Sequence, residues 1–506
     1  MDANGGIEIE RKFDVDELTP LPRLNDLPGV QAIAEPMTFD LEAIYFDTND
    51  LVLSAVHITL RRRTGGDDAG WHLKLPETAG RRREIHAPLG GGDGQGEADV
   101  VPESLAQLVQ VYVRDAPLVP VARLRTTRGV HALIGAGGET LAVLCDDRVR
   151  ADRLIDRPSS AAWREWEIEL VDGPEDMLDA GQAVLAAAGI LVSRHASKLA
   201  RTLGDRMPAE PPPDRRRPTP TGPAGNVLVA SLGEQIGVIR AQDPQVRQHA
   251  TGSVHAMRVA LRRLRSVLAT YRSLVDPTVV HYLRTELGWL AAVLGGSRDE
   301  EVLQRRLTGL LDREPPVLLL GPIRARLETR SETDADTAVR TLGTTLDTHR
   351  YFRLLDALDA LVASPPFTAT ADQDARVVVP ALVAKEWKRL RRAVRRAAET
   401  VPGPQRDLAL HEVRKRAKRL RYAAETAHPL NPKRAVRVSG FAQKLQTMLG
   451  DQHDSVIARE RLLRRGGVDA YLRGENTFSY GRLHAQEQQK AAEAEALFWK
   501  AWTNRP

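Results

Sequence analysis

The chain has 506 residues, of which 42% are hydrophobic and 27% charged, a globular composition long enough for two or three domains. Its single cysteine, Cys145, excludes an intramolecular disulfide, and no apolar run reaches the 18 residues that predict a membrane span. The first residues do not have the pattern of a secretory signal, so we expect a cytoplasmic protein. The formal net charge is only +5 despite 72 Lys and Arg, so the local arrangement of basic residues is more informative than their number.

Residues 7–13 alternate apolar and ionic side chains with the period of a β-strand. One face of this strand is apolar, and the other carries Glu8, Glu10 and Lys12. Three ionic groups in a row need water, partners on a neighbouring strand, or a charged ligand with metal ions. The remainder of the chain has to decide between these alternatives.

Similar ionic faces recur through the first half of the chain. They comprise Arg61 with Arg63, His72 with Lys74, the group Arg82, Glu84 and His86, and the group Glu165, Glu167 and Glu169. These short period-two segments predict an antiparallel sheet or barrel, interrupted by helices at 102–113 and 174–188. We expect the apolar faces to pack against helices while the charged faces line a wet interior.

The mixture of acids and bases in that interior indicates a chemistry. Clustered carboxylates repel one another unless cations intervene, and oxygen ligands suit Mg²⁺ or Mn²⁺. Arg and Lys facing the same cavity would bind phosphate oxygens. The combination is typical of a phosphoryl-transfer site. For any one strand, a solvated surface with cross-strand ion pairs explains the charges equally well.

A segment rich in proline and arginine divides the chain. It contains three consecutive prolines, 211–213, and three consecutive arginines, 215–217, which cannot bury enough apolar surface to order themselves. We therefore expect an exposed linker at 205–224, between a first domain at 1–204 and a second at 225–506. The second domain has helical periodicity nearly throughout, which predicts an all-α fold.

The helical half contains an internal repeat. The segment that begins at His255 matches the one that begins at His411, and 294–299 matches 449–454. The separation from the histidine to the last residue of the second segment is 44 residues in the first copy and 43 in the second. Two matches at nearly equal spacing predict a duplicated helical unit.

Both copies carry a basic stripe beside an apolar seam. At about 100° per residue, His255, Arg258, Arg262 and Arg265 lie within an arc of about 80°. The second copy repeats the offsets, and 385–396 adds a further stripe. A solvated surface explains one stripe, but the duplication favours a polyanionic ligand. Aromatic residues are only 5% of the chain and none interrupts the first stripe, so a phosphate polymer fits better than nucleic acid.

The first half resembles the CYTH, or triphosphate tunnel metalloenzyme, superfamily over about residues 5–204. The resemblance rests on the Glu8-x-Glu10-x-Lys12 motif, supported by 45–48, 60–63, 73–75, 82–84, 127–128, Asp146, the Glu165 to Glu169 ladder and 197–198. It implies an eight-stranded antiparallel tunnel that binds triphosphates with a divalent metal. It further implies catalytic roles for Glu8, Glu10 and Lys12, and metal binding by Glu8, Glu10, Asp146, Glu167 and Glu169. Asp147 stands as the alternative to Asp146, and two of the three ladder residues would suffice for metal. The implied triphosphate ligands are Lys12, Arg61, Arg63, Lys74, Arg82, Glu84, Arg125, Arg128 and Lys198.

The second half resembles the CHAD, or conserved histidine α-helical, domain over about residues 225–506. That family implies two pseudo-symmetric four-helix bundles that bind inorganic polyphosphate. The implied polyphosphate ligands are His255, Arg258, Arg262, Arg263, Arg265, Lys385, Arg389, Arg392, Arg396, His411, Arg414, Lys415, Lys418, Arg419 and Arg421. The second copy departs from the first at 415–416, and His453 stands where the first copy has Arg298.

Together the two halves predict a hydrolase that converts tripolyphosphate to pyrophosphate and phosphate with Mg²⁺ or Mn²⁺, while the helical domain binds long-chain polyphosphate. One alternative is an organic triphosphate substrate such as thiamine triphosphate. Alternation places the candidate stacking residues Trp71 and Trp166 on the outer faces, which disfavours it. A second alternative is a polyphosphate-binding scaffold without turnover. We expect no membrane or nucleic-acid partner, and the oligomeric state stays open.

Overall fold

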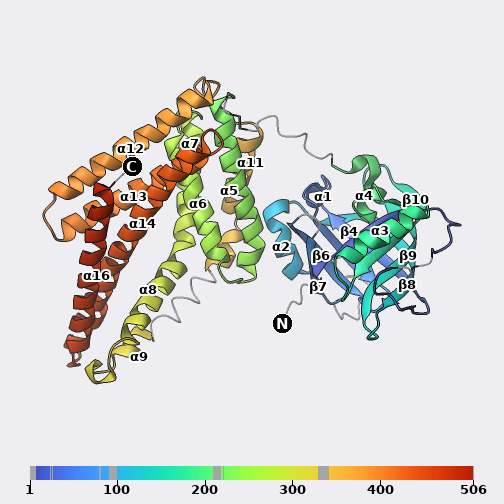
Figure 1. Ribbon diagram of the computed structural model, residues 1–506, viewed down its shortest axis with the longest axis horizontal. Coiled ribbons are helices and arrows are strands. Elements are labelled where there is room, and N and C mark those ends of the chain that lie inside the picture. The colour runs from blue at the N-terminus through green and yellow to red at the C-terminus, as the bar shows by residue number, and fades with distance from the viewer. Residues whose placement is uncertain are drawn as a thin grey trace. The chain divides into compact units, whose positions relative to one another are not determined.

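The computed structural model describes residues 7–22, 24, 27–78, 81–89, 100–208, 218–219, 221–328 and 341–504. The chain forms two compact units, Met1–Pro212 and Pro213–Pro506 (Figure 1). Within the described ranges, every helix is too short or too polar to cross a lipid bilayer. Residues 209–217 and 220 of the predicted linker lie outside the described part of the chain.

The first unit is an antiparallel sheet that closes on itself. Its strands are β1 (Ile7–Glu8), β2 (Glu10–Val15), β3 (Ala32–Ile33), β4 (Met37–Asp47), β5 (Thr59–Thr64), β6 (Gly70–Thr78), β7 (Arg81–Ala87), β8 (Val119–Ile134), β9 (Thr140–Arg153), β10 (Ser159–Leu170) and β11 (Leu191–Val192). Their order is β1-β7-β6-β5-β4-β8-β9-β10-β2-β11, with β3 beside β8. Ile9 alone separates β1, which pairs with β7, from β2, which pairs with β10, so one stretch of chain closes the sheet. Counted as one strand, β1 and β2 complete an eight-stranded wall in the described residues, which confirms the predicted tunnel.

Helices cover the outer face of this wall (Figure 1). The core under α2 (Glu103–Val113) and α1 (Val52–Ala55) contains Leu60, Leu73 and Trp71. The core under α3 (Asp176–Ala187) contains Phe13 and Trp166. Because side chains alternate along a strand, burying these apolar residues outside directs their ionic neighbours into the tunnel. The predicted division between apolar and charged faces is confirmed.

One carboxylate fastens the end of β4 to the helix that follows. Asp47 is buried and accepts hydrogen bonds from the backbone N–H of Leu53 at 2.9 Å and of Ser54 at 2.8 Å. Burial raises the pKa of Asp47, because the surrounding hydrogen bonds only partly offset the cost of desolvating the charge. This connection fixes the end of the strand that carries Tyr45.

A short helix, α4 (Lys198–Leu203), follows the last strand of the unit. Ser197 caps it, because its hydroxyl accepts a hydrogen bond from the N–H of Ala200 at 3.0 Å. Leu199 and Leu203 pack with Leu124, which also lines the tunnel interior. The helix therefore holds Lys198 at the border between an apolar cluster and the charged interior.

The second unit is helical throughout its described residues (Figure 1). Its helices are α5 (Ala224–Arg247), α6 (Ser253–Thr270), α7 (Pro277–Val293), α8 (Gly295–Leu311), α9 (Ile323–Glu328), α11 (His349–Ala363), α12 (Ala375–Glu399), α13 (Pro404–Thr426), α14 (Pro432–Arg461), α15 (Asp469–Leu472) and α16 (Phe478–Thr503). α5, α6, α7 and α11 pack together, and α12, α13, α14 and α16 share a second core. α6 and α13 join the two groups. The predicted pair of four-helix bundles is confirmed.

The repeat predicted from the sequence has a structural counterpart in both copies. Arg258 donates to the carbonyl of Gly295 at 3.4 Å. Arg414, at the matching position, lies so close to Gly450 that a Cβ added there would be 3.4 Å from its guanidinium. The equivalent arginine therefore lies against the equivalent glycine in each copy.

Candidate functional site

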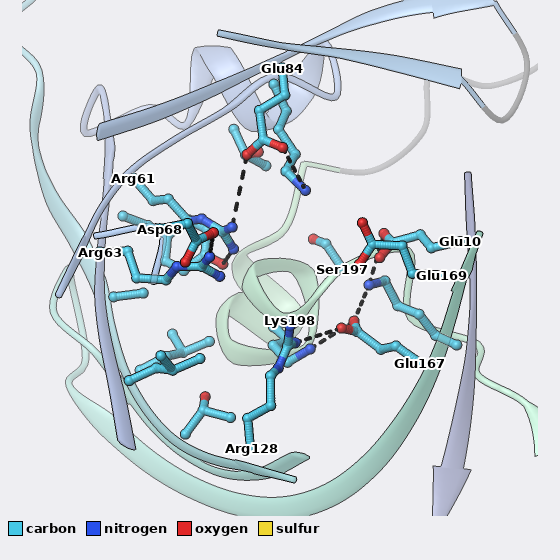
Figure 2. Close-up of a pocket in the computed structure, with 18 residues that line it drawn as sticks. Glu10, Arg61, Arg63, Asp68, Glu84, Arg128, Glu167, Glu169, Ser197 and Lys198 are labelled. Carbon is cyan, nitrogen blue, oxygen red and sulfur yellow. Dashed lines mark hydrogen bonds and ion pairs between the residues drawn. The ribbon is translucent and has the colours of Figure 1, made fainter. Parts of the chain in front are cut away.

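A cavity of about 160 Å³ lies inside the tunnel of the first unit (Figure 2). Its described lining consists of Glu10, Lys12, Leu41, Ala43, Tyr45, Thr59, Arg61, Arg63, Asp68, Lys74, Glu84, Leu124, Thr126, Arg128, Glu167, Glu169, Ser197 and Lys198. Figure 2 shows Glu10, Glu167 and Glu169 on one side and Arg61 and Arg63 on the opposite side. We call these two sides the acid wall and the basic wall.

The acid wall is built on three neighbouring strands. Glu169 of β10 stands directly opposite Glu10 of β2, and Glu165 stands opposite Asp147 of β9. One carboxylate oxygen from each of Asp147, Glu165 and Glu167 lies within 4.8 Å of the others. All three members of the Glu165 to Glu169 ladder thus belong to this wall, together with Asp147.

Lys12 lies among the carboxylates of the acid wall. Its Nζ is 2.9 Å from Glu10 and forms a close ion pair with Glu167. Burial alone would lower the pKa of Lys12, but Glu167 and Glu10 outweigh burial and raise it. Burial likewise opposes ionisation of Glu167 and Glu10, yet nearby cations lower the pKa of both carboxyl groups. Lys12 acts on both, together with Lys74 on Glu10 and with Lys198 and Arg128 on Glu167. At neutral pH the ammonium and both carboxylates are therefore charged.

Two further cations neutralise the deep part of the acid wall. Lys198 lies 2.8 Å from Asp147 and 2.7 Å from both Glu165 and Glu167. Arg128 lies 2.6 Å from Asp147 and 2.8 Å from Glu167. These carboxylates hold the pKa of Lys198 and of Arg128 well above their usual values despite burial. The acid wall thus carries its own counter-ions.

The basic wall is less fully neutralised. Arg63 pairs with Asp68, but its buried Nε has no hydrogen-bond partner among the described residues. Burial, with the charges of Arg61 and Arg128, lowers the pKa of Arg63 to about 10. Glu84 lies at ion-pair range, 4.0 Å from Arg61 and 3.8 Å from Lys74. An anion in the cavity would satisfy donors that the chain itself leaves only partly satisfied.

Tyr45 is a lining residue to which the sequence analysis gave no role. Its hydroxyl lies 3.5 Å from Arg61, and its side chain is buried. Burial opposes ionisation, but Arg61, with smaller contributions from Lys198 and Lys74, lowers the pKa of Tyr45. The hydroxyl is a hydrogen-bond donor surrounded by cations, which suits a phosphate oxygen. Tyr45 belongs to the 45–48 motif and lies two residues before Asp47, and this position was the sequence feature from which its role in the site could have been predicted.

Two predicted site residues lie outside the tunnel. Asp146 accepts two hydrogen bonds from Arg164, each 2.8 Å long, on the outer face. Arg125 pairs with Glu42 at 3.0 Å and is also outside. Both assignments are wrong for the same reason, because residues one or three apart on a regular strand face opposite sides. Asp147 and Arg128 occupy the inward positions.

Most of the other predicted site residues line the cavity together. They are Glu10, Lys12, Arg61, Arg63, Lys74, Glu84, Arg128, Glu167, Glu169 and Lys198. The side chains of Glu8 and Arg82 lie outside the described residues, although both positions are paired in β1 and β7. Asp68, which follows β5 and pairs with Arg63, is a lining residue that was not predicted from the sequence.

The acid wall fits a hard divalent cation. Its ligand atoms are all carboxylate oxygens, which Mg²⁺ and Mn²⁺ prefer, and three of them converge within 4.8 Å. Glu10, Glu167 and Glu169 line the cavity, with Asp147 and Glu165 beside them. A metal here would have to take the place of Lys12, Lys198 or Arg128 as partner of these oxygens.

Basic residues of both copies approach one another in the helical unit. Arg265 of α6 and Arg419 of α13 both lie near Arg284 of α7. Burial, and then Arg284, lower the pKa of Arg265, while burial, with Arg416 and Arg284, lowers the pKa of Arg419 against the opposing effect of Glu386. Arg262 donates to the hydroxyl of Tyr422 at 3.2 Å, which ties α6 to α13. Arg284 was missed because it belongs to a helix without a basic stripe of its own.

The second copy places a histidine among cations. The rings of His411 and His453 lie 4.1 Å apart. Burial first, and then His453, Lys415, Arg414 and Lys418, lower the pKa of His411 to about 4. His411 is therefore neutral at pH 7 and has several cations as neighbours.

Other predicted polyphosphate ligands are already paired or simply exposed. Arg421 contacts Glu425 at 2.7 Å, and Arg263 lies 3.4 Å from the same carboxylate. Lys415 lies 3.8 Å from Glu412, and Arg389 pairs with Glu386. Lys385, Arg392 and Arg396 are exposed on α12, while His255, Arg258 and Lys418 lie on α6 and α13 as predicted.

Comparison with known proteins identifies both units. Residues 6–203 match the CYTH domain and residues 230–463 match the CHAD domain. Two uncharacterized Mycobacterium tuberculosis proteins, MT2285 and Rv2226, are each 40% identical over 494 residues, which cover 95% of this chain and 93% of theirs. Among solved structures, PptA from Streptomyces chartreusis is 22% identical with a TM-score of 0.46, covering 56% of this chain and 99% of that one. The CHAD domain from Ricinus communis is 24% identical with a TM-score of 0.44, covering 56% and 93%. CYTH proteins are metal-dependent, triphosphate-processing enzymes. The chain belongs to the CYTH–CHAD proteins, within the triphosphate tunnel enzyme family.

Proposed function

We propose that the tunnel hydrolyses inorganic triphosphate to pyrophosphate and phosphate with Mg²⁺ or Mn²⁺, while the helical unit binds long-chain polyphosphate. The observation that carries the first part is the acid wall facing the basic wall across one cavity. A metal-bound phosphate chain has both charges to match: its cation suits carboxylates and its oxygens suit Arg and Lys.

The chain's own residues divide the work between the two walls. Glu10, Glu167 and Glu169, with Asp147 and Glu165, would hold the metal, which supplies charge neutralisation and an acidified water. Arg61, Arg63 and Lys74 bind and orient the phosphate chain, so that the scissile bond and water are aligned.

Lys12 acts as a cation and not as a general base. Glu167 and Glu10 raise its pKa, so the amine stays protonated at neutral pH. From its position 2.9 Å from Glu10 it can donate a hydrogen bond to a phosphate oxygen while keeping both carboxylates in place.

Metal and triphosphate binding support each other in this arrangement. Lys198 and Arg128 now neutralise Asp147, Glu165 and Glu167 at 2.6–2.8 Å. A phosphate that attracts these cations frees carboxylates for the metal, and a metal that takes the carboxylates frees the cations for phosphate. Binding of either ligand alone leaves buried charges with fewer partners, which is unfavourable.

The lining favours an inorganic substrate. Trp71 and Trp166, the sequence's candidate stacking residues, are buried in the outer cores under α2 and α3. Tyr45 is the aromatic residue in the described lining, and its hydroxyl faces Arg61. Thiamine or a nucleobase would therefore find little aromatic surface to stack on.

Polyphosphate binding by the helical unit is supported by a concentration of basic residues from both copies. Arg265 and Arg419 come together near Arg284, and burial, with the neighbouring cations as a smaller cause, lowers the pKa of His411 to about 4. A flexible chain of phosphates would relieve this repulsion along α6 and α13.

Phosphate release tests the proposal directly. The purified chain is assayed with Mg²⁺ or Mn²⁺ on tripolyphosphate, long-chain polyphosphate, ATP and thiamine triphosphate. We expect tripolyphosphate to be hydrolysed fastest, and Glu10→Gln to abolish turnover while polyphosphate binding is kept. Equal rates on all four substrates would refute inorganic preference. Absence of metal-dependent release from any of them, with intact polyphosphate binding, would favour a scaffold.

A further inference from the structure

A second group of metal-ligating side chains lies on the neighbouring strands β6 and β7. His72 of β6 stands directly opposite His86 of β7, and Glu84 lies two residues before His86. One ligand atom from each of the three residues lies within 4.8 Å of the others. Two imidazoles and one carboxylate are a different donor set from the all-carboxylate acid wall.

The hydrogen bonds of His72 leave a place for a cation. Its Nε2 lies 2.9 Å from the backbone carbonyl of Asp68, which can only accept, so Nε2 carries the hydrogen. Its Nδ1 lies 2.9 Å from a carboxylate oxygen of Glu84. In the neutral ring Nδ1 is a lone-pair acceptor, so two acceptors face each other unless a proton or a metal ion lies between them.

The exposure of the three side chains suits a metal ion that reaches the site from one side. The His72 side chain is fully buried, whereas the side chains of Glu84 and His86 are 15% and 48% exposed. A ring nitrogen and a carboxylate oxygen that face each other are the donor pair with which an imidazole and a carboxylate bind a metal.

We propose that His72, Glu84 and His86 bind one transition-metal ion of borderline softness, such as Zn²⁺, at a site separate from the acid wall. Ligand atoms about 2.1 Å from a tetrahedral Zn²⁺ lie about 3.4 Å apart. His72 Nδ1 lies 2.9 Å from Oε1 of Glu84, and His86 Nε2 lies 3.7 Å from Oε2 of the same carboxylate, so both rings are within reach of a metal bound to Glu84. The second nitrogen of His72 donates to a backbone carbonyl, as is usual for metal-binding histidines.

Three protein ligands leave one coordination position for water or for a phosphate oxygen in the cavity that Glu84 lines. Lys74 and Arg61 lie 3.8 and 4.0 Å from Glu84 and repel an added cation. An anion in the cavity offsets this repulsion, so tripolyphosphate tightens zinc binding. The inference does not depend on hydrolysis.

Zinc titration of the full chain, followed by calorimetry, tests the site. Excess Mg²⁺ first saturates hard-ligand sites such as the acid wall. We expect one Zn²⁺ to bind, His86→Ala to weaken it about 10- to 100-fold, and His72→Gln with His86→Ala to remove it. X-ray absorption of the zinc complex should show two imidazole ligands. Glu10→Gln is the matched control, which should keep zinc binding even where it loses triphosphate turnover.

The outcomes separate a metal from a proton and from misfolding. His86 is half-exposed, so His86→Ala is expected to keep the wild-type thermal unfolding curve, which circular dichroism checks. Unchanged zinc affinity in that variant would overturn the proposal. Imidazole ¹⁵N NMR gives a second check. A spectrum that shows both ring nitrogens of His72 protonated in the presence of Zn²⁺ would also overturn the proposal, since a proton would then occupy the position of the metal.

Discussion

The tunnel and the helical unit present cations in opposite ways. In the tunnel, Lys198 and Arg128 already have carboxylates within 2.8 Å. In the helical unit, Arg265 and Arg419 both lie near the cation Arg284, with Glu386 as an opposing charge near Arg419. A buried cavity cannot leave charges unpaired, whereas an exposed surface can take counter-ions from the solvent. Under the proposed function, the tunnel would select a ligand that replaces both sets of partners, whereas the helical surface would accept a flexible phosphate polymer.

The largest effect should come from two adjacent aspartates that face opposite sides of β9. Asp147→Asn removes a carboxylate of the acid wall, so we expect metal-dependent phosphate release to fall about 100-fold or more. Asp146→Asn changes the outer face and should leave the rate within about twofold. Steady-state rates of both variants on tripolyphosphate make the comparison. Equal losses would mean that the acid wall is wrongly placed.

The basic wall offers a second matched pair. Arg63→Gln removes a buried donor that faces the cavity, and we expect kcat/KM for tripolyphosphate to drop about 10- to 100-fold. Arg125→Gln removes an outward arginine paired with Glu42 and should change little. A loss in Arg125→Gln as large as in Arg63→Gln would contradict the inward and outward assignment.

The helical unit should respond to salt where the tunnel does not. Polyphosphate binding by exposed arginines releases counter-ions, so its affinity should fall steeply between about 50 and 200 mM salt. Arg258→Gln and Arg414→Gln, at equivalent repeat positions, should each lower the slope of log affinity against log salt by about 1. Fluorescence anisotropy with labelled polyphosphate measures this. Arg376→Gln, an arginine paired with Asp374, is the control, and an equal change in its slope would exclude a specific face.

The smallest effect concerns pH. In the protein without ligand the pKa of His411 is about 4, and a bound polyanion would raise this pKa. Binding then takes up a proton, so affinity should rise as pH falls through the bound-state pKa and level off below about 4. The gain is about tenfold for each unit by which polyphosphate raises the pKa. Titrations between about pH 8 and pH 5 should lose this dependence in His411→Gln but keep it in His349→Gln. A dependence that persists in His411→Gln would assign it to another group.

Alternation along strands predicted most of the cavity. Glu10 with Lys12, and Arg61 with Arg63, face inward as their period-two spacing required. The rule failed where it was not applied strictly, since Arg125 and Arg128 are three residues apart and cannot share a face of a regular strand. The same rule separates the two aspartates of β9, because Asp146 faces outward with Arg148 and Arg150, which leaves Asp147 on the inward face.

Other features depend on contacts that the sequence does not specify. Asp68 reaches Arg63 from the loop after β5, and Arg284 meets Arg265 and Arg419 only because α7 packs beside α6 and the two bundles join. The helical fold was easier to predict, since His255 and His411 begin two copies whose equal spacing fixes equivalent helices.

The described lining of the cavity contains five carboxylates and six cations, so its formal charge is close to zero. What it possesses is a dipole, because the carboxylates of β2 and β10 lie across the cavity from the arginines of β5 (Figure 2). A dipole does not concentrate anions, but it does turn a ligand that has a positive and a negative end. Tripolyphosphate alone has two identical ends, so we expect the tunnel to orient its metal complex instead, with the metal toward the acid wall and the remaining oxygens toward the basic wall, before any bond is broken.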